Sequence, residues 1–225
     1  MEKVKNQYTD LASVMKELES CGTEQNRKIY RRHGAVGELF GVSFANINRI
    51  AKSIKKNHPL ALQLWDTGNS DAQTLATLIA DPFAMSSKDL QSWVSGIRFG
   101  GVASYFIDKL VIKTPLVKER MGVWIPAEQE YVRLCGYAIA GQLAKNDPDV
   151  SDSLFLSLIE KIEREIHDSA NKAKEMMNLT LIAIGKRNDV LRASALAAAK
   201  RIGKVDVDHG ETSCKTPDAV KELSA

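Results

Sequence analysis

The sequence predicts an all-α protein in which pairs of helices stack one after another to form an α-solenoid. Apolar residues recur at helical spacing along nearly all of the 225 residues, and no segment alternates like a strand bounded by hairpin turns. The segments DAQTLATLIADP, EYVRLCGYAIAG and AKEMMNLTLIAIG share a polar start, a middle of long apolar residues and an end of small residues. Recurrence of such helix pairs at intervals of ~30–45 residues is typical of a helical repeat. A plain globular helix bundle is the alternative that this weak similarity leaves open.

The first helix is expected in TDLASVMKELES, where Leu11, Val14, Met15 and Leu18 share one face. It is expected to end at Gly22, because glycine readily takes the left-handed conformation of a helix C-terminal cap. A second helix is expected in SFANINRIAKSIKKN, whose lysines fall in the last turn and interact favourably with the helix dipole. Its apolar face is predicted to comprise Phe44, Ile47, Ile50, Ala51 and Ile54.

Further helices are predicted from apolar periodicity over about 58–66, 69–80, 86–97, 101–112, 128–144, 151–168, 171–186 and 188–202. In the stretch SGIRFGGVASYFIDKL, Gly96, Gly100 and Gly101 are expected to end one helix and begin the next, with positive φ allowed there. Tryptophans that lie at helix ends beside apolar stripes are expected to pack in the core rather than to stack on bases. They are Trp65, Trp93 and Trp124.

We expect residues 1–225 to form a single repeat domain with a polar tail from about 203. His209 and Cys214 in this tail have no metal-type spacing to other ligands, so a docked tail is expected rather than a metal site. Asn178 lies between apolar residues of an inner helix and is expected to be a buried polar group that needs hydrogen-bond partners.

We expect a cytoplasmic protein that needs no metal or cofactor, and we expect it to be a monomer. Apolar residues make up 44% and charged residues 26% of the chain, and the three cysteines are far apart. No apolar run approaches the ~18 residues that span a membrane, and the start MEKVKNQYTD lacks the apolar core of a signal peptide. The sequence holds no GxGxxG, GxxxxGK[ST] or HExxH motif.

The net charge of +3 is unevenly distributed along the chain. Residues 26–56 contain eight Lys and Arg residues against one Glu, a net charge of +7, so the rest of the chain carries −4. Such asymmetry favours a polyanionic partner, with a solvated helix face as the alternative. The candidate DNA contacts are Arg27, Arg31, Arg32, Arg49, Lys52, Lys55, Lys56, Arg98, Arg133, Lys172, Lys174, Lys186 and Arg187.

Five segments carry a resemblance to a known family: GTEQNRKIYRRHG, FGVSFANINRIAK, LALQLWDTGNSDAQTLATLIADP, NKAKEMMNLTLIAIGKRN and KVDVDHGETSCKTPDA. They resemble bacterial DNA alkylation repair proteins, the AlkD-like superfamily of HEAT-repeat DNA glycosylases, and the resemblance extends from Gly22 to Ala219. It implies an armadillo-like all-α superhelix of HEAT-like pairs with a basic concave surface for duplex DNA. Active members excise cationic N3- and N7-alkylated purines without a metal.

The resemblance also implies which residue types would carry the chemistry. Active members have a Trp-x-x-x-Asp motif at a helix start and an Arg on the next inner helix. Departure of the charged purine leaves an oxocarbenium-like sugar, which the Asp carboxylate stabilises while the Arg holds the phosphate backbone. Aromatic ring faces add cation–π attraction to the damaged base.

This chain departs from the pattern at each of those positions. Alignment of FGGVASYFIDKLV and EQEYVRLCGYAIAG places Gly100, Ser104 and Leu134 where the Trp, Asp and Arg belong. Arg133 is one residue off, about 100° around the helix. An uncharged serine cannot replace the carboxylate, and loss of one preorganised polar partner typically costs ~10²–10³ in rate. Asp108, expected one helical turn beyond Ser104 and about 6 Å away, is the possible substitute.

Three functions are therefore compatible with the sequence. The first is DNA binding on a basic concave face without base excision, because the catalytic set is lost. The second is an active alkylpurine DNA glycosylase that uses Asp108 or another carboxylate. The third is a scaffold that binds a protein partner, as many HEAT arrays do.

Overall fold

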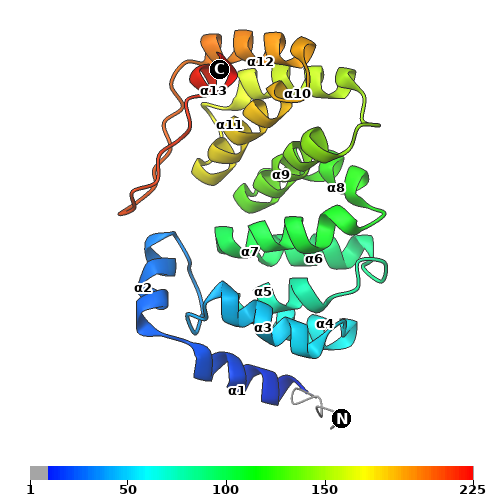
Figure 1. The fold of residues 1–225 in the computed structure, drawn as a ribbon, viewed down its shortest axis with the longest axis vertical. Helices are drawn as coiled ribbons and strands as arrows, with labels where there is room; N and C mark the ends of the chain where they lie inside the picture. The colour runs from blue at the N-terminus through cyan, green and yellow to red at the C-terminus, as the bar shows by residue number, and fades with distance from the viewer. Residues whose placement is uncertain (1–9, 225) are drawn as a thin grey trace. The chain divides into compact units, whose positions relative to one another are not determined.

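The computed structural model describes residues 10–224, and the regular elements of this part of the chain are helical (Figure 1). The amino-terminal stretch that bears on a signal peptide lies largely outside the described residues. An isolated antiparallel bridge joins Gly22 and Val42. The α-helices are α1 (Leu11–Cys21), α2 (Glu24–Arg32), α3 (Phe44–Ile54), α4 (His58–Asp66), α5 (Ser70–Ile79), α6 (Ser87–Gly96), α7 (Gly100–Tyr105), α8 (Val117–Trp124), α9 (Glu130–Asn146), α10 (Asp152–Glu165), α11 (Asn171–Gly185), α12 (Asp189–Ile202) and α13 (Ala219–Ser224).

The chain divides into two compact units. The first comprises Met1–Val117 with Gly210–Thr212, and the second comprises Lys118–His209 with Ser213–Ala225. The first contains α1 to α7, and the second contains most of α8 and then α9 to α13. The expectation of one continuous repeat domain stays a prediction.

In the first unit, α5 packs against α3, α4 and α7. Residues 70–77 and Ile79 of α5 are all buried, which explains why this helix carries small Ala and Thr residues instead of a single apolar stripe. Trp65 and Trp93 stack with ring centroids 4.1 Å apart, and Phe106 packs beside both rings. Both tryptophans are buried, as is Trp124 of the second unit, so the predicted core role of the three is confirmed.

In the second unit, α9 packs along α11, and α12 packs against both α10 and α11. The hydroxyl of Thr180 on α11 donates to the backbone carbonyl of Tyr137 on α9 at 2.8 Å. Both residues are buried, so this bond satisfies polar groups inside the contact between the two helices.

The polar tail docks on α11, as the sequence predicts. The Asn171 side chain exchanges two hydrogen bonds with the Asp208 backbone, at 2.7 and 2.8 Å. Asn178 is 1% exposed, and its Nδ2 donates to the carbonyl of Pro217 at 2.9 Å. The expectation of a buried polar side chain with a partner is therefore confirmed. His209 pairs with the Thr216 hydroxyl at 3.0 Å, and no group of potential metal ligands occurs among the described residues.

Gly22 does not take the left-handed conformation expected of it. Its φ and ψ are −71° and 144°, its N–H donates to the carbonyl of Glu19 at 3.0 Å at the end of α1, and it also forms the bridge with Val42. A Cβ at this position would lie 2.3 Å from the carbonyl oxygen of Phe40. Glycine is needed at residue 22 because two backbone segments approach closely there.

Two helices were not predicted, and a third helical segment differs from its predicted form. Helices α2 and α8 lack a long apolar stripe, so periodicity does not reveal them. The side chain of Thr23 caps the start of α2, because it accepts a hydrogen bond from the Asn26 amide. The single helix expected over 101–112 is α7 followed by a π-helical turn, Phe106–Leu110, and a 3₁₀ turn, Val111–Lys113. Gly96 ends α6 and Gly100 begins α7 as predicted, without positive φ.

Candidate nucleic-acid interface

The start of α7 holds two of the positions that the family pattern assigns to catalysis. Gly100 is the first residue of the helix, and a Cβ built there would have no heavy atom within 4 Å beyond its immediate chain surroundings. Ser104, four residues later, is exposed. The surroundings of Gly100 could therefore accept a larger side chain, yet neither position offers a ring or a carboxylate.

Asp108 lies in the π-helical turn and is half-buried. Ser104 and Asp108 lie on either side of the change from α-helix to this π-helical turn, which forms i→i+5 hydrogen bonds. The expectation that Asp108 lies about one turn beyond Ser104, as a substitute carboxylate, stays a prediction.

An aromatic cluster comprising Tyr30, Phe44, Phe99 and Tyr105 lies beside the start of α7. The rings of Phe44 and Tyr105 stack with centroids 4.9 Å apart and an interplanar angle of 12°. Tyr30 packs against Phe44 and Phe99 at centroid distances of 5.7 and 5.5 Å. The Nδ2 of Asn48 donates to the Tyr105 hydroxyl at 2.9 Å and fixes that ring. Sequence reasoning missed this cluster because its aromatic residues are spread over three separate segments, α2, α3 and α7 with its N-cap.

The surroundings of Tyr30 keep its hydroxyl protonated and hydrogen-bonded. Burial raises the pKa of Tyr30 to about 12, with further contributions from Asp71 and Tyr105. Its hydroxyl donates to the carbonyl of Val42 at 2.8 Å. Tyr30 therefore acts as a neutral donor that ties α2 to the segment before α3.

The loop between α2 and α3 is fixed by a buried carboxylate. Asp71, which is 3% exposed near the start of α5, accepts hydrogen bonds from the amides of Phe40, Gly41 and Val42 at 2.6, 3.0 and 3.0 Å. Burial raises the pKa of Asp71 above its ordinary value, and the three N–H donors act in the opposite direction. Local sequence could not indicate this role, because donors and acceptor are about 30 residues apart.

Two of the predicted DNA contacts also hold this loop. The guanidinium of Arg27 donates to the carbonyl of Phe40 at 2.9 Å. That of Arg31 donates to the carbonyls of Ala35 and Gly37 at 3.0 and 2.6 Å. Their charges remain at the surface of the first unit, but part of their hydrogen-bonding capacity is used within the fold.

The other end of α3 is rich in lysine. We define the lysine end as Lys52, Lys55, Lys56 and Lys113, all of which are exposed. Lys55 is the only non-glycine residue among the described residues with positive φ, at 65°. Such strain costs roughly 1–3 kcal/mol, whereas a cation at a helix C-terminus contributes about 0.3–1 kcal/mol. The free-energy cost of the backbone strain at Lys55 therefore exceeds the stabilisation that the lysine gains from the helix dipole.

The remaining predicted contacts of the first unit differ in their surroundings. Arg32 is exposed, and its guanidinium makes no hydrogen bond or ion pair with any other described residue. Arg49 forms an ion pair with Glu17 at 2.9 Å. Arg98 donates to the carbonyls of Ser95 and Ile97 at 2.7 and 2.8 Å, which closes the end of α6.

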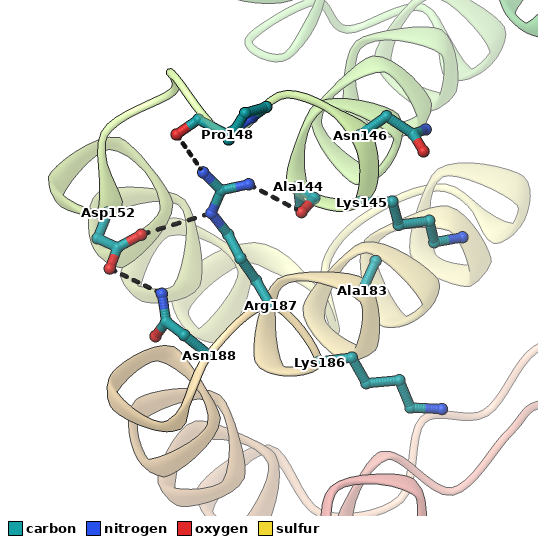
Figure 2. Close-up of a pocket in the computed structure, with 9 residues that line it drawn as sticks. All are labelled: Ala144, Lys145, Asn146, Pro148, Asp152, Ala183, Lys186, Arg187 and Asn188. Atoms are coloured by element: carbon teal, nitrogen blue, oxygen red, sulfur yellow. Dashed lines mark hydrogen bonds and ion pairs between the residues drawn. The ribbon is translucent and has the colours of Figure 1, made fainter.

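In the second unit, a pocket of about 600 Å³ lies at the ends of α9 and α11 (Figure 2). Two of its lining residues, Lys186 and Arg187, are predicted contacts, and Figure 2 shows them pointing in different directions. Lys186 forms an ion pair with Glu222 at 2.6 Å between two exposed side chains. The guanidinium of Arg187 donates to carbonyls of the 144–150 segment and lies 3.5 Å from a carboxylate oxygen of Asp152. Arg187 is therefore a structural cation.

Comparison with known proteins places these features in a family. The family model described as DNA alkylation repair enzyme matches residues 14–223. The chain belongs to the DNA alkylation repair enzyme family. It is 28% identical over 212 residues to the uncharacterized protein Lin0241 of Listeria innocua and 27% identical to Lmo0209 of Listeria monocytogenes, covering 92% of each chain.

A solved structure shares the fold of this family member. It is described as "A new family of proteins related to the HEAT-like repeat DNA glycosylases with affinity for branched DNA structures". The TM-score is 0.86 at 31% identity, over 96% of this chain and 93% of the other. The predicted all-α HEAT-like repeat fold is confirmed. In this DNA alkylation repair family member, no helix between residues 10 and 224 has the length and hydropathy to cross a membrane.

The third matched position of the family pattern lies on α9 of the second unit. Leu134 is apolar and 7% exposed. The neighbouring Arg133 donates to the carbonyl of Ala127 at 2.9 Å and to the Ser169 hydroxyl at 3.2 Å. The Arg133 guanidinium thus connects the segment before α9 with the turn after α10.

The other two predicted contacts of the second unit open α11. Lys172 forms an ion pair with Glu175 at 3.5 Å, and its backbone amide donates to Glu130 at 2.6 Å. Lys174 is half-buried, and no hydrogen bond or ion pair joins its ammonium to another described side chain. That each of these residues contacts DNA stays a prediction.

Proposed function

We propose that this protein binds DNA, including branched DNA, through backbone phosphates and does not excise alkylated bases. The single observation that carries the proposal is the start of α7. The position that matches the family's tryptophan is Gly100, which supplies no ring although a Cβ there would meet no heavy atom within 4 Å. The position that matches the carboxylate is the uncharged Ser104.

The surroundings of the third position support the same proposal. Leu134 cannot hold a phosphate, and the guanidinium of Arg133 is already used by Ala127 and Ser169. Without an anion to stabilise the sugar cation and without an arginine clamp, the largest electrostatic contribution to base excision is missing.

Support for DNA binding comes from charge and from a relative. The segment 26–56 has a net charge of +7, and Arg32, Lys52 and Lys55 within it are exposed and unpaired among the described residues. The solved relative with 31% identity is described as having affinity for branched DNA. Phosphate contacts from such cations are independent of base sequence, which suits recognition of DNA shape.

We expect binding to fall steeply as salt rises from about 50 to 200 mM, because each neutralised phosphate releases counterions. Fluorescence anisotropy with a labelled four-way junction and a linear duplex of the same length would measure the slope of log K against log salt. Affinity for the junction is expected to exceed that for the duplex. Absence of binding at 50 mM salt, or binding that salt does not change, would contradict the proposal and favour a scaffold for a protein partner.

No release of 7-methylguanine or 3-methyladenine from methylated DNA is expected above the uncatalysed rate. Chromatography of released bases, run beside an active member of the family, would measure this. If the wild type releases either base and Asp108→Asn abolishes the release, the protein is an active alkylpurine DNA glycosylase. Release that survives Asp108→Asn would also refute the proposal, and it would assign the chemistry to another group.

A further inference from the structure

The two ends of α3 have different chemistry. Its first turn belongs to the aromatic cluster, through Phe44, and its last turn begins the lysine end, with Lys52. The helix has 11 residues and a length of about 16 Å, so the lysine end is separated from the start of α7 by most of a helix. A ligand at the lysine end would therefore not occupy the position that matches the catalytic site.

Lys56 has a structural reason to be at the lysine end. Its ammonium donates to the carbonyls of Leu78 and Ala80 at 3.3 and 2.6 Å and so closes the end of α5. Burial lowers the pKa of Lys56, and the nearby charge of Lys113 acts in the same direction, while Asp81 opposes both. The fold thus accounts for Lys56 in spite of the neighbouring positive charge.

No comparable hydrogen bond explains why residue 55 is a lysine. Its φ and ψ of 65° and −148° match those of Gly203, 69° and −147°, which follows the last turn of α12. Every other described residue with positive φ is a glycine, because a Cβ makes this conformation unfavourable. The chain therefore has a glycine at one helix end and a strained lysine at an equivalent helix end.

Interactions of the Lys55 side chain within the fold do not offset the cost of this strain. It is exposed, and its ammonium makes no hydrogen bond or ion pair with any other described residue. It also adds positive charge beside Lys52 and Lys56, which disfavours the folded state electrostatically. Strain at a residue with no internal partner indicates a role outside the fold.

We propose that Lys55 and Lys52 form a phosphate-binding site for the backbone of nucleic acid, about one helix length from the start of α7. The proposal rests on the proposed function, which supplies the polyanion. The geometry gives Lys55 its role: a lysine kept where glycine would be more stable places a second unpaired ammonium three residues after Lys52. Contacts of this kind add affinity without base specificity.

The strain is tested by exchanging the two residue types between the two equivalent positions. Lys55→Gly is expected to raise the melting temperature by about 2–4 °C, and Gly203→Lys to lower it by a similar amount. A Cβ at Gly203 would meet nothing within 4 Å, so the reverse exchange introduces backbone strain without a steric clash of the Cβ. Loss of stability in Lys55→Gly would show that the lysine is there for the fold, and the proposal would be overturned.

The contact is tested by the affinity for junction and duplex DNA. Lys55→Gln keeps the backbone strain but removes the charge, so Kd is expected to rise about fivefold to tenfold at 0.1 M salt and the salt slope to become shallower by about 1. Lys55→Arg should restore both values. Lys200→Ala, which removes an exposed lysine from the last turn of α12, is the matched control and should change neither.

The outcomes separate this inference from the proposed function. If the wild type does not bind DNA, the proposed function fails and this inference fails with it. If the wild type binds with a steep salt slope but Lys55→Gln binds equally well, only the inference about Lys55 is wrong. If Lys55→Gln loses more affinity for the junction than for the duplex, the result would support the inference and place the contact on a second DNA arm.

Discussion

Replacing Asp71 with alanine is expected to destabilise the protein by about 3–5 kcal/mol, because three amide donors, two of them buried, lose a charged acceptor at once. Between residues 10 and 224, the carboxylate of Asp71 is the acceptor for the amides of Phe40, Gly41 and Val42. Urea unfolding followed by circular dichroism would measure the loss. Hydrogen exchange should locate it, since these three amides are expected to lose protection first.

Asp71→Asn tests whether the acceptor geometry matters as well as the charge. Both carboxylate oxygens accept hydrogen bonds, whereas asparagine would direct its NH₂ donor at one or two of the amides. The expected loss is therefore about 2–3 kcal/mol, near that of the alanine variant. Asp66→Ala removes an exposed carboxylate at the end of α4 and is the control, with a change within about 0.5 kcal/mol expected. Equal small effects at both positions would show that the loop does not depend on Asp71.

The fold could be predicted because each long helix carries its own signal. Amphipathic spacing identified α1, α3 and α10 and gave their ends to within a few residues. Periodicity failed for α2, whose sequence EQNRKIYRR has no apolar stripe and no buried residue. The register of the π-helical turn at Phe106–Leu110 was equally inaccessible, because the same residues would fit an α-helix.

Within the candidate site, only the residues that belong to a continuous sequence motif could be predicted. The resemblance indicated Gly100 and Ser104 because the family pattern fixes their spacing, and the structure adds that the glycine faces open space. It could not indicate that Arg27 and Arg31 also hold the loop before α3, since side-chain conformation decides which carbonyl a guanidinium reaches. The strain at Lys55 is likewise invisible in the sequence, where the residue reads as an ordinary helix-terminal lysine.

Arg187→Met is expected to destabilise the protein by about 2–4 kcal/mol, the second large effect. Its guanidinium donates to four carbonyls, those of Ala144, Asp147, Pro148 and Val150, at 2.9–3.0 Å. It also lies over the ring of Phe155, 5.1 Å from the centroid. Methionine keeps much of the aliphatic packing but supplies no donor, so the end of α9 and the turn after it lose their common partner (Figure 2).

The neighbouring residue provides the matched control. Lys186→Met removes one positive charge at the adjacent position, but its ion pair with Glu222 is exposed and should contribute less than about 1 kcal/mol. Arg187→Lys is expected to be intermediate, because a single ammonium cannot reach all the carbonyls that the planar guanidinium reaches. Thermal unfolding of the three variants would order them as Lys186→Met, Arg187→Lys and Arg187→Met, from most to least stable. Equal losses for Lys186→Met and Arg187→Met would mean that loss of charge, and not the four hydrogen bonds, explains the effect; in that case Arg187 would again be a candidate for contact with DNA.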